Sequence, residues 1–96
     1  MSDARNEFIA KTKENLDKID ASIVNLEAKA NEKKGEVRRE LNATLSSIRN
    51  SKEQMERRLE ELRLASEPAW EDVKRGTEQA WSALSDAVRK AGERFQ

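Results

Sequence analysis

Few side chains in this 96-residue chain could do chemistry other than ion pairing. The sequence contains no histidine, cysteine or tyrosine, so no imidazole can activate the serine and threonine hydroxyls as nucleophiles. Glu53, Glu56 and Glu60 would share one helix face and could bind a hard cation weakly. Such a site needs six or more converging oxygens, and arginines lie beside these acids, so we interpret them as a solvated face. We expect a protein without catalytic residues, metal ligands or cofactors.

Charge in this chain is abundant but balanced. The 19 lysines and arginines equal the 19 aspartates and glutamates in number, so the net charge is zero. A nucleic-acid-binding protein needs a basic face that displaces counterions, and we therefore expect no binding of nucleic acid. Acid-to-base pairs in the favourable i,i+4 order, among them Glu7–Lys11 and Glu14–Lys18, indicate helix instead.

The composition also bears on the compartment. The absence of cysteine fits a reducing environment. The first residues lack the apolar run of a secretory signal, and no apolar stretch is long enough to cross a bilayer. We expect a cytoplasmic protein.

Apolar residues recur at alternating intervals of three and four along the first two-thirds of the chain, which predicts a heptad seam on a helix. The part of the seam expected to join copies of the chain consists of Ile9, Leu16, Ile19, Ile23, Leu26 and Val37. The seam continues through Leu41, Leu45, Ile48, Met55, Leu59 and Leu62. Lys52 also falls at a seam position, where we expect it to extend its ammonium group to water or to set the register.

The seam keeps its phase across Gly35, because Ala30 and Val37 are one heptad apart. We therefore predict a continuous helix from about residue 4 to residue 65. Two places could break it. Gly35 follows four residues without a large apolar side chain, and residues 42–51 are rich in asparagine and serine, which are indifferent helix formers.

Pro68 marks the strong break in the pattern, since proline is tolerated only in the first turn of a helix. Ser66 is a natural N-cap, so we predict a second helix from about residue 67 to residue 94. Its sequence repeats after eleven residues, which places both tryptophans nearly on one face. The apolar stripe of this helix consists of Trp70, Val73, Trp81, Leu84, Val88 and Phe95.

The second helix carries a family resemblance. The segments Ala69-Trp70-Glu71-Asp72-Val73-Lys74 and Ala80-Trp81-Ser82-Ala83-Leu84, with the closing Arg94-Phe95, resemble small bacterial coiled-coil proteins of the stress-response type. The long charged helix before them is similar as well. The resemblance implies a soluble, cytoplasmic helical protein with no known catalytic residues to carry over.

These patterns predict an all-α fold, in which a long coiled-coil helix and a shorter antiparallel amphipathic helix form a hairpin. The second helix would cover Leu41, Ile48, Met55, Leu59 and Leu62. Because it is too short to cover the seam from Ile9 to Ala30 as well, we expect hairpins to assemble into a homo-oligomer, a dimer or a tetramer. The alternative is a monomeric three-helix bundle with turns near Gly35 and Pro68.

Two functions follow from this fold. The first is a non-catalytic helical scaffold or interaction protein, associated with stress by the resemblance, which assembles through its heptad seam and has a further helical protein as a partner. The alternative is a peripheral membrane protein that binds lipid through residues 69–95. Interfacial helices usually carry lysine and arginine on the polar face, whereas here the signs alternate, which favours packing over lipid binding.

Overall fold

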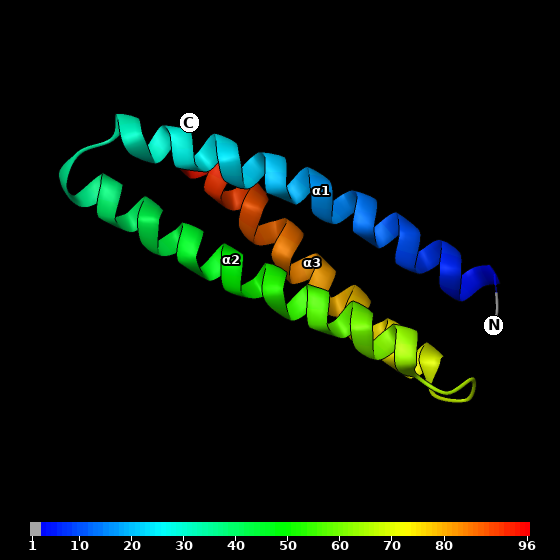
Figure 1. Cartoon of the computed structure of the whole chain (residues 1–96). Coiled ribbons are helices and arrows are strands. Elements are labelled where there is room, and N and C mark those ends of the chain that lie inside the picture. The colour runs from blue at the N-terminus through cyan, green and yellow to red at the C-terminus, as the bar shows by residue number, and fades with distance from the viewer. Residues whose placement is uncertain (1–2) are drawn as a thin grey trace.

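A computed structural model describes residues 3–96 and shows three helices in sequence. Helix α1 spans Asp3–Glu32, α2 spans Gly35–Leu64 and α3 spans Trp70–Arg94. The helices lie side by side and alternate in direction, forming an elongated bundle of 51 × 17 × 17 Å (Figure 1). The expected all-α class is confirmed, and the arrangement is a three-helix bundle.

The predicted continuous helix from residue 4 to residue 65 is wrong. The chain turns at Lys33 and Lys34, and Gly35 adopts a φ of 62°. This left-handed conformation is open to glycine without steric cost, which is why the reversal falls there. The alternative with turns near Gly35 and Pro68 describes the architecture. A preserved heptad phase is compatible with both arrangements, because the seams of two antiparallel helices also face each other.

The polar stretch from residue 42 to residue 51 does not interrupt α2. Leu41, Leu45 and Ile48 are each almost completely buried, and this burial stabilises the helix despite the weak propensity of the residues between them. The Thr44 hydroxyl donates a hydrogen bond to the Glu40 carbonyl at 2.9 Å, so it is satisfied within the helix.

The second turn lies close to its predicted position. The Ser66 carbonyl accepts hydrogen bonds from the N–H groups of Ala69 and Trp70, both at 3.0 Å. Pro68 therefore lies in the turn that leads into α3, and the helix begins at Trp70, three residues later than predicted. The predicted N-cap at Ser66 is wrong, because Ala69 occupies the N-cap of α3 and no side chain caps the helix there. The end at Arg94 agrees with the prediction.

A single hydrophobic core runs between the three helices. The buried apolar seam residues of α1 are Leu16, Ile19, Ile23, Leu26 and Ala30. The premise of the oligomer prediction, that this stretch lacks a partner within the chain, is therefore wrong, because α2 folds back along α1. Ile9 is half-buried against the core, and Val37 is 45% exposed. The oligomeric state itself stays a prediction.

The residues predicted to pack α3 onto α2 separate into two groups. The buried group consists of Leu41, Ile48, Met55, Leu59, Leu62, Trp70, Leu84 and Phe95. The half-buried group consists of Val73, Trp81 and Val88. The second group lies on α3 alone, and two of its members border a groove.

Candidate interaction groove

Three consecutive hollows, of about 230, 290 and 180 Å³, lie between α1 and α3. Each is lined on α1 by the residues at positions i, i+3, i+4 and i+7, and each begins one heptad after the previous one. The α1 linings are Phe8, Lys11, Thr12 and Asn15, then Asn15, Lys18, Ile19 and Ser22, then Ser22, Asn25, Leu26 and Lys29. Four residues in this pattern form the hole that receives one side chain of a neighbouring helix in a coiled coil.

The α3 bank of this groove, which we call the α1–α3 groove, combines two apolar residues with small ones. Trp81 borders the first two hollows, and Val88 borders the second and third. Between and beyond them lie Ser82, Ser85 and Gly92, whose small size leaves the hollows open.

The two tryptophans, which the sequence placed on one face, have different surroundings. Trp70 is buried, with the guanidinium of Arg5 5.6 Å and the ammonium of Lys74 5.8 Å from its ring centre. Trp81 is half-buried and lines the groove. An eleven-residue repeat advances about 20° around a helix, so Trp81 is rotated toward the edge of the core relative to Trp70, while Leu84 is rotated into the core relative to Val73.

The α1 bank of the groove carries Lys11, Lys18 and Lys29. None of the ion pairs found within residues 3–96 includes these lysines. In particular, the pairs expected with Glu7 and Glu14 do not form within 4 Å. The α1 bank therefore presents three lysines that no carboxylate of the described chain contacts within 4 Å.

The α3 bank is electrostatically different. Its cation, Arg89, pairs with Asp86 at 3.4 Å and with Glu93 at 3.0 Å, and these carboxylates raise the pKa of Arg89. Glu78 is the acidic residue of the lining. Among the residues that line the groove, the charged ones on α1 are lysines, whereas those on α3 are Glu78 and the already paired Arg89.

The polar contacts between helices lie at the other two interfaces of the bundle. Lys52 of α2 pairs with Asp20 of α1 at 2.6 Å, and Arg94 of α3 pairs with Glu40 of α2 at 2.6 Å. No hydrogen bond or ion pair of the described residues joins α1 to α3. Beyond its first turn, where Lys74 lies 5.3 Å from the ring centre of Phe8, α3 meets α1 through apolar contact alone.

A separate hollow, of about 460 Å³, lies between α1 and α2, but the charges of its lining residues largely neutralise one another. Lys52 binds Asp20 and also Glu56 at 3.3 Å, which raises the pKa of Lys52 above its ordinary value. Arg63 pairs with Glu60 and lowers the pKa of that carboxyl. The side chain of Lys52 is 24% exposed, so it reaches the surface from its seam position and links two helices there.

The glutamates that the sequence offered as a weak cation site, Glu53, Glu56 and Glu60, lie on α2, and the last two line this hollow. Glu56 and Glu60 are engaged by basic side chains, whereas Glu53 takes part in no ion pair of the described chain. Over residues 3–96, no three His, Cys, Asp or Glu side chains come together as a metal site would require.

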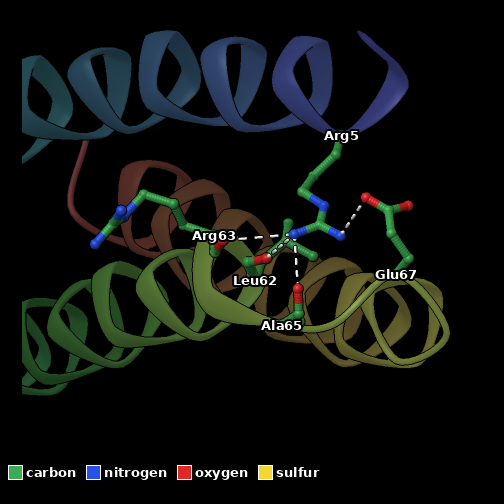
Figure 2. A network of polar contacts seen from close by, with 5 residues as sticks. All are labelled: Arg5, Leu62, Arg63, Ala65 and Glu67. Atoms are coloured by element: carbon green, nitrogen blue, oxygen red, sulfur yellow. Dashed lines mark hydrogen bonds and ion pairs between the residues drawn. The ribbon is translucent and has the colours of Figure 1, made fainter. Parts of the chain in front are cut away.

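Sequence reasoning did not identify Arg5, the most extensively bonded polar residue of the bundle. Its side chain is 3% exposed and lies at the end of the bundle where α2 meets the second turn (Figure 2). Nη1 donates to the Ala65 carbonyl at 2.8 Å and to the Leu62 and Arg63 carbonyls at 3.4 Å, and Nη2 binds Glu67 at 3.2 Å. Arg5 thus caps the C-terminus of α2, whose last carbonyls have no partners within the helix.

One sequence feature could have revealed Arg5. It lies one heptad before Thr12, and Thr12, Ile19 and Leu26 follow at seven-residue intervals as buried positions. Arg5 therefore continues the seam toward the N-terminus. A charged residue at a seam position predicts a buried partner for that charge.

The chain is thus an all-α three-helix bundle with an open, heptad-spaced groove beside α1. No protein-family model matches the chain, and neither a curated protein nor a solved structure matches it. The resemblance to bacterial stress-type coiled-coil proteins stays an expectation. None of the helices formed by residues 3–96 is both long and apolar enough to cross a membrane.

Proposed function

We propose that this chain is a non-catalytic helical interaction protein that binds a partner helix in the α1–α3 groove. The observation that carries the proposal is the heptad spacing of the three hollows. A helix laid along the groove would insert one side chain into each hollow, completing a fourth side of the bundle.

The dimensions of the groove suit such a partner. From Phe8 to Lys29 the α1 bank extends over 22 residues, which corresponds to roughly 30 Å at the rise of an α-helix. Three heptads of a partner helix cover this distance. Ile19, Leu26 and Val88 supply an apolar floor, and the hydroxyl and amide groups on both banks can accept or donate hydrogen bonds at its edges.

This proposal revises the expected mode of assembly. The heptad seam of α1 is used within the chain, so binding through the groove replaces binding through the seam. Homo-oligomerisation is a separate prediction, tested by sedimentation equilibrium. A cytoplasmic location, based on the cysteine-free sequence, and a role in stress, based on the resemblance, belong to the same proposal.

Lipid binding by residues 69–95 has less support. Trp70, Leu84 and Phe95, which would be the membrane-facing residues, are buried in the bundle. Helix α3 would have to leave the bundle before its apolar stripe could enter a bilayer. Its departure would expose to water the core residues of α1 and α2 that it covers.

The test is a titration of the full chain followed by the two indole N–H signals in a ¹H–¹⁵N spectrum. The probe is a three-heptad helical peptide with leucine at one position per heptad and glutamine on its flanks. We expect saturable movement of the Trp81 signal, while that of Trp70 stays in place. Ser85→Phe, which fills the middle hollow, should abolish the movement, and Ser47→Phe on the exposed face of α2 is the matched control.

Two results would overturn the proposal. One is the absence of saturable binding by helical peptides of any charge. The other is a response to anionic phosphatidylglycerol vesicles, but not to peptide, in which both indole signals change because α3 has left the bundle. The second result would transfer the function to lipid binding.

A further inference from the structure

The charge distribution of the α1–α3 groove indicates what kind of helix fits it, if the proposed function is correct. We infer that the partner is an acidic amphipathic helix, whose carboxylates lie along the α1 bank. The inference rests on the three lysines, the difference between the two banks and the poor fit of a second copy.

The spacing of the lysines matches a helical partner. Lys11 and Lys18 are one heptad apart, or roughly 10 Å along the axis, and Lys29 lies eleven residues further. A partner helix with Glu or Asp at intervals of seven and eleven residues on one flank would present a carboxylate to each, because both intervals return to nearly the same side of a helix. Because none of the lysines has an ion partner in the described chain, no existing pair needs to be broken.

The α3 bank sets which flank of the partner faces which helix. Arg89 is already held by two carboxylates, and Glu78 would repel an acidic side chain. Ser82 and Ser85 offer hydroxyl groups instead. The acidic flank of the partner therefore faces α1, and a neutral or basic flank faces α3, which fixes the rotation of the partner about its axis.

A second copy of this chain fits the groove poorly. In the two-fold arrangement that sets α1 against α1, the lysines of one copy would lie beside those of the other and repel them. In the arrangement that sets α1 against α3, the lysines would meet a bank on which Arg89 already binds Asp86 and Glu93, and Glu78 is its lining carboxylate. A bilayer also fits poorly, because the hollows are recessed between two helices and a flat surface would touch only their rims. A separate acidic helix satisfies both the shape and the charge.

The experiment compares three peptides with identical leucine positions and with glutamate, glutamine or lysine on one flank. Binding is measured by the Trp81 indole signal at low and at physiological ionic strength. We expect the glutamate peptide to bind about tenfold more tightly than the glutamine peptide at low ionic strength, with a smaller ratio at higher ionic strength. The lysine peptide should bind most weakly.

Two charge-reversal variants locate the effect. The triple variant K11E/K18E/K29E should lose the preference for the glutamate peptide or reverse it. The control K34E/R38E/R57E changes the net charge equally at exposed positions outside the groove and should keep the preference. K11Q/K18Q/K29Q is the milder companion, and thermal melts verify that each variant is folded.

Each other outcome has a defined meaning. Equal binding of the three peptides would overturn the inference about charge but leave the proposed function standing. An equal loss in the groove variant and the control would also overturn it, since the effect would then reflect net charge alone. Concentration-dependent movement of the Trp81 signal without peptide, lost in K11E/K18E/K29E, would assign the groove to a second copy. Binding by no peptide would overturn both proposals.

Discussion

Replacing Arg5 by methionine should destabilise the bundle far more than its position near the N-terminus would indicate. The guanidinium links α1 to the end of α2 through three backbone carbonyls and to the second turn through Glu67 (Figure 2). Methionine keeps most of the apolar stem but removes every donor. The carbonyl at Ala65, which receives the shortest bond, then loses its charged partner.

The size of the effect follows from these contacts. A hydrogen bond from a charged donor contributes about 1.5–3 kcal/mol, and the contact with the Trp70 ring adds about 0.5–1 kcal/mol. The pair with Glu67 adds little, because that carboxylate is 61% exposed and water screens it. We expect a loss of about 2–4 kcal/mol in the free energy of unfolding, which for a domain of this size lowers Tm by about 10–25 °C.

The assay is thermal and urea unfolding followed by circular dichroism. Arg38→Met, at an exposed position, is the matched control and should leave Tm within about 2 °C of the parent. Glu67→Gln should cost less than about 1 kcal/mol, because it removes only the exposed pair. If Arg5→Met melts like the parent, or if Glu67→Gln costs as much as Arg5→Met, the reasoning that the buried carbonyl contacts stabilise the bundle is refuted.

Three further predictions concern other parts of the bundle. Gly35→Ala forces a φ of 62° on a residue with a Cβ and should lower the free energy of unfolding by about 1–2 kcal/mol. Gly92→Ala lies in a helix with open space for a Cβ and should raise it by about 0.5–1 kcal/mol in the same urea titrations. Leu84→Ala should cost about 2–5 kcal/mol because its side chain is completely buried, and an effect no larger than that of Leu64→Ala, at an exposed position, would contradict the core. Lys52→Met removes a base whose pKa two carboxylates raise above 10.5, so its destabilising effect should be full at pH 7 and disappear as pH rises through that raised pKa. A difference between Lys52→Met and the parent that persists unchanged above this range would refute the pairing.

The core was predictable because the apolar residues at heptad positions are the ones that become buried, whether the chain forms one long helix or two antiparallel helices. Leu16, Ile23, Leu41 and Leu62 occupy seam positions in the sequence and are buried in the bundle. Proline gave the second turn for an equally local reason, since it lacks the N–H that a helix interior requires. These features depend on period and covalent structure alone.

The first turn was not predictable from the same pattern. One helix of some sixty residues and two antiparallel helices of thirty have the same apolar face. In the first arrangement this face packs against another copy of the chain, and in the second it packs against the neighbouring helix of the same chain. Folding back at Gly35 buries the α1 seam within the chain, while a continuous helix would leave it exposed until another copy arrived. Burial within one chain does not depend on protein concentration, and this favours the turn at Gly35 over the continuous helix. The gain depends on how the whole chain folds back, so no single heptad reveals it.

The unequal interfaces of the bundle follow from where its polar contacts fall. Buried leucines and the pair between Arg94 and Glu40 hold α3 against α2, and Lys52 ties α2 to α1. Between α1 and α3 the cation–ring contacts lie at the first turn of α3, and the remaining length rests on apolar contact. A partner helix entering this side would cover the half-buried ring of Trp81 and meet three lysines without separating any existing ion pair. Its binding would therefore add apolar burial and new charge pairs at little cost to the bundle, which is the physical reason to look for the partner at this interface.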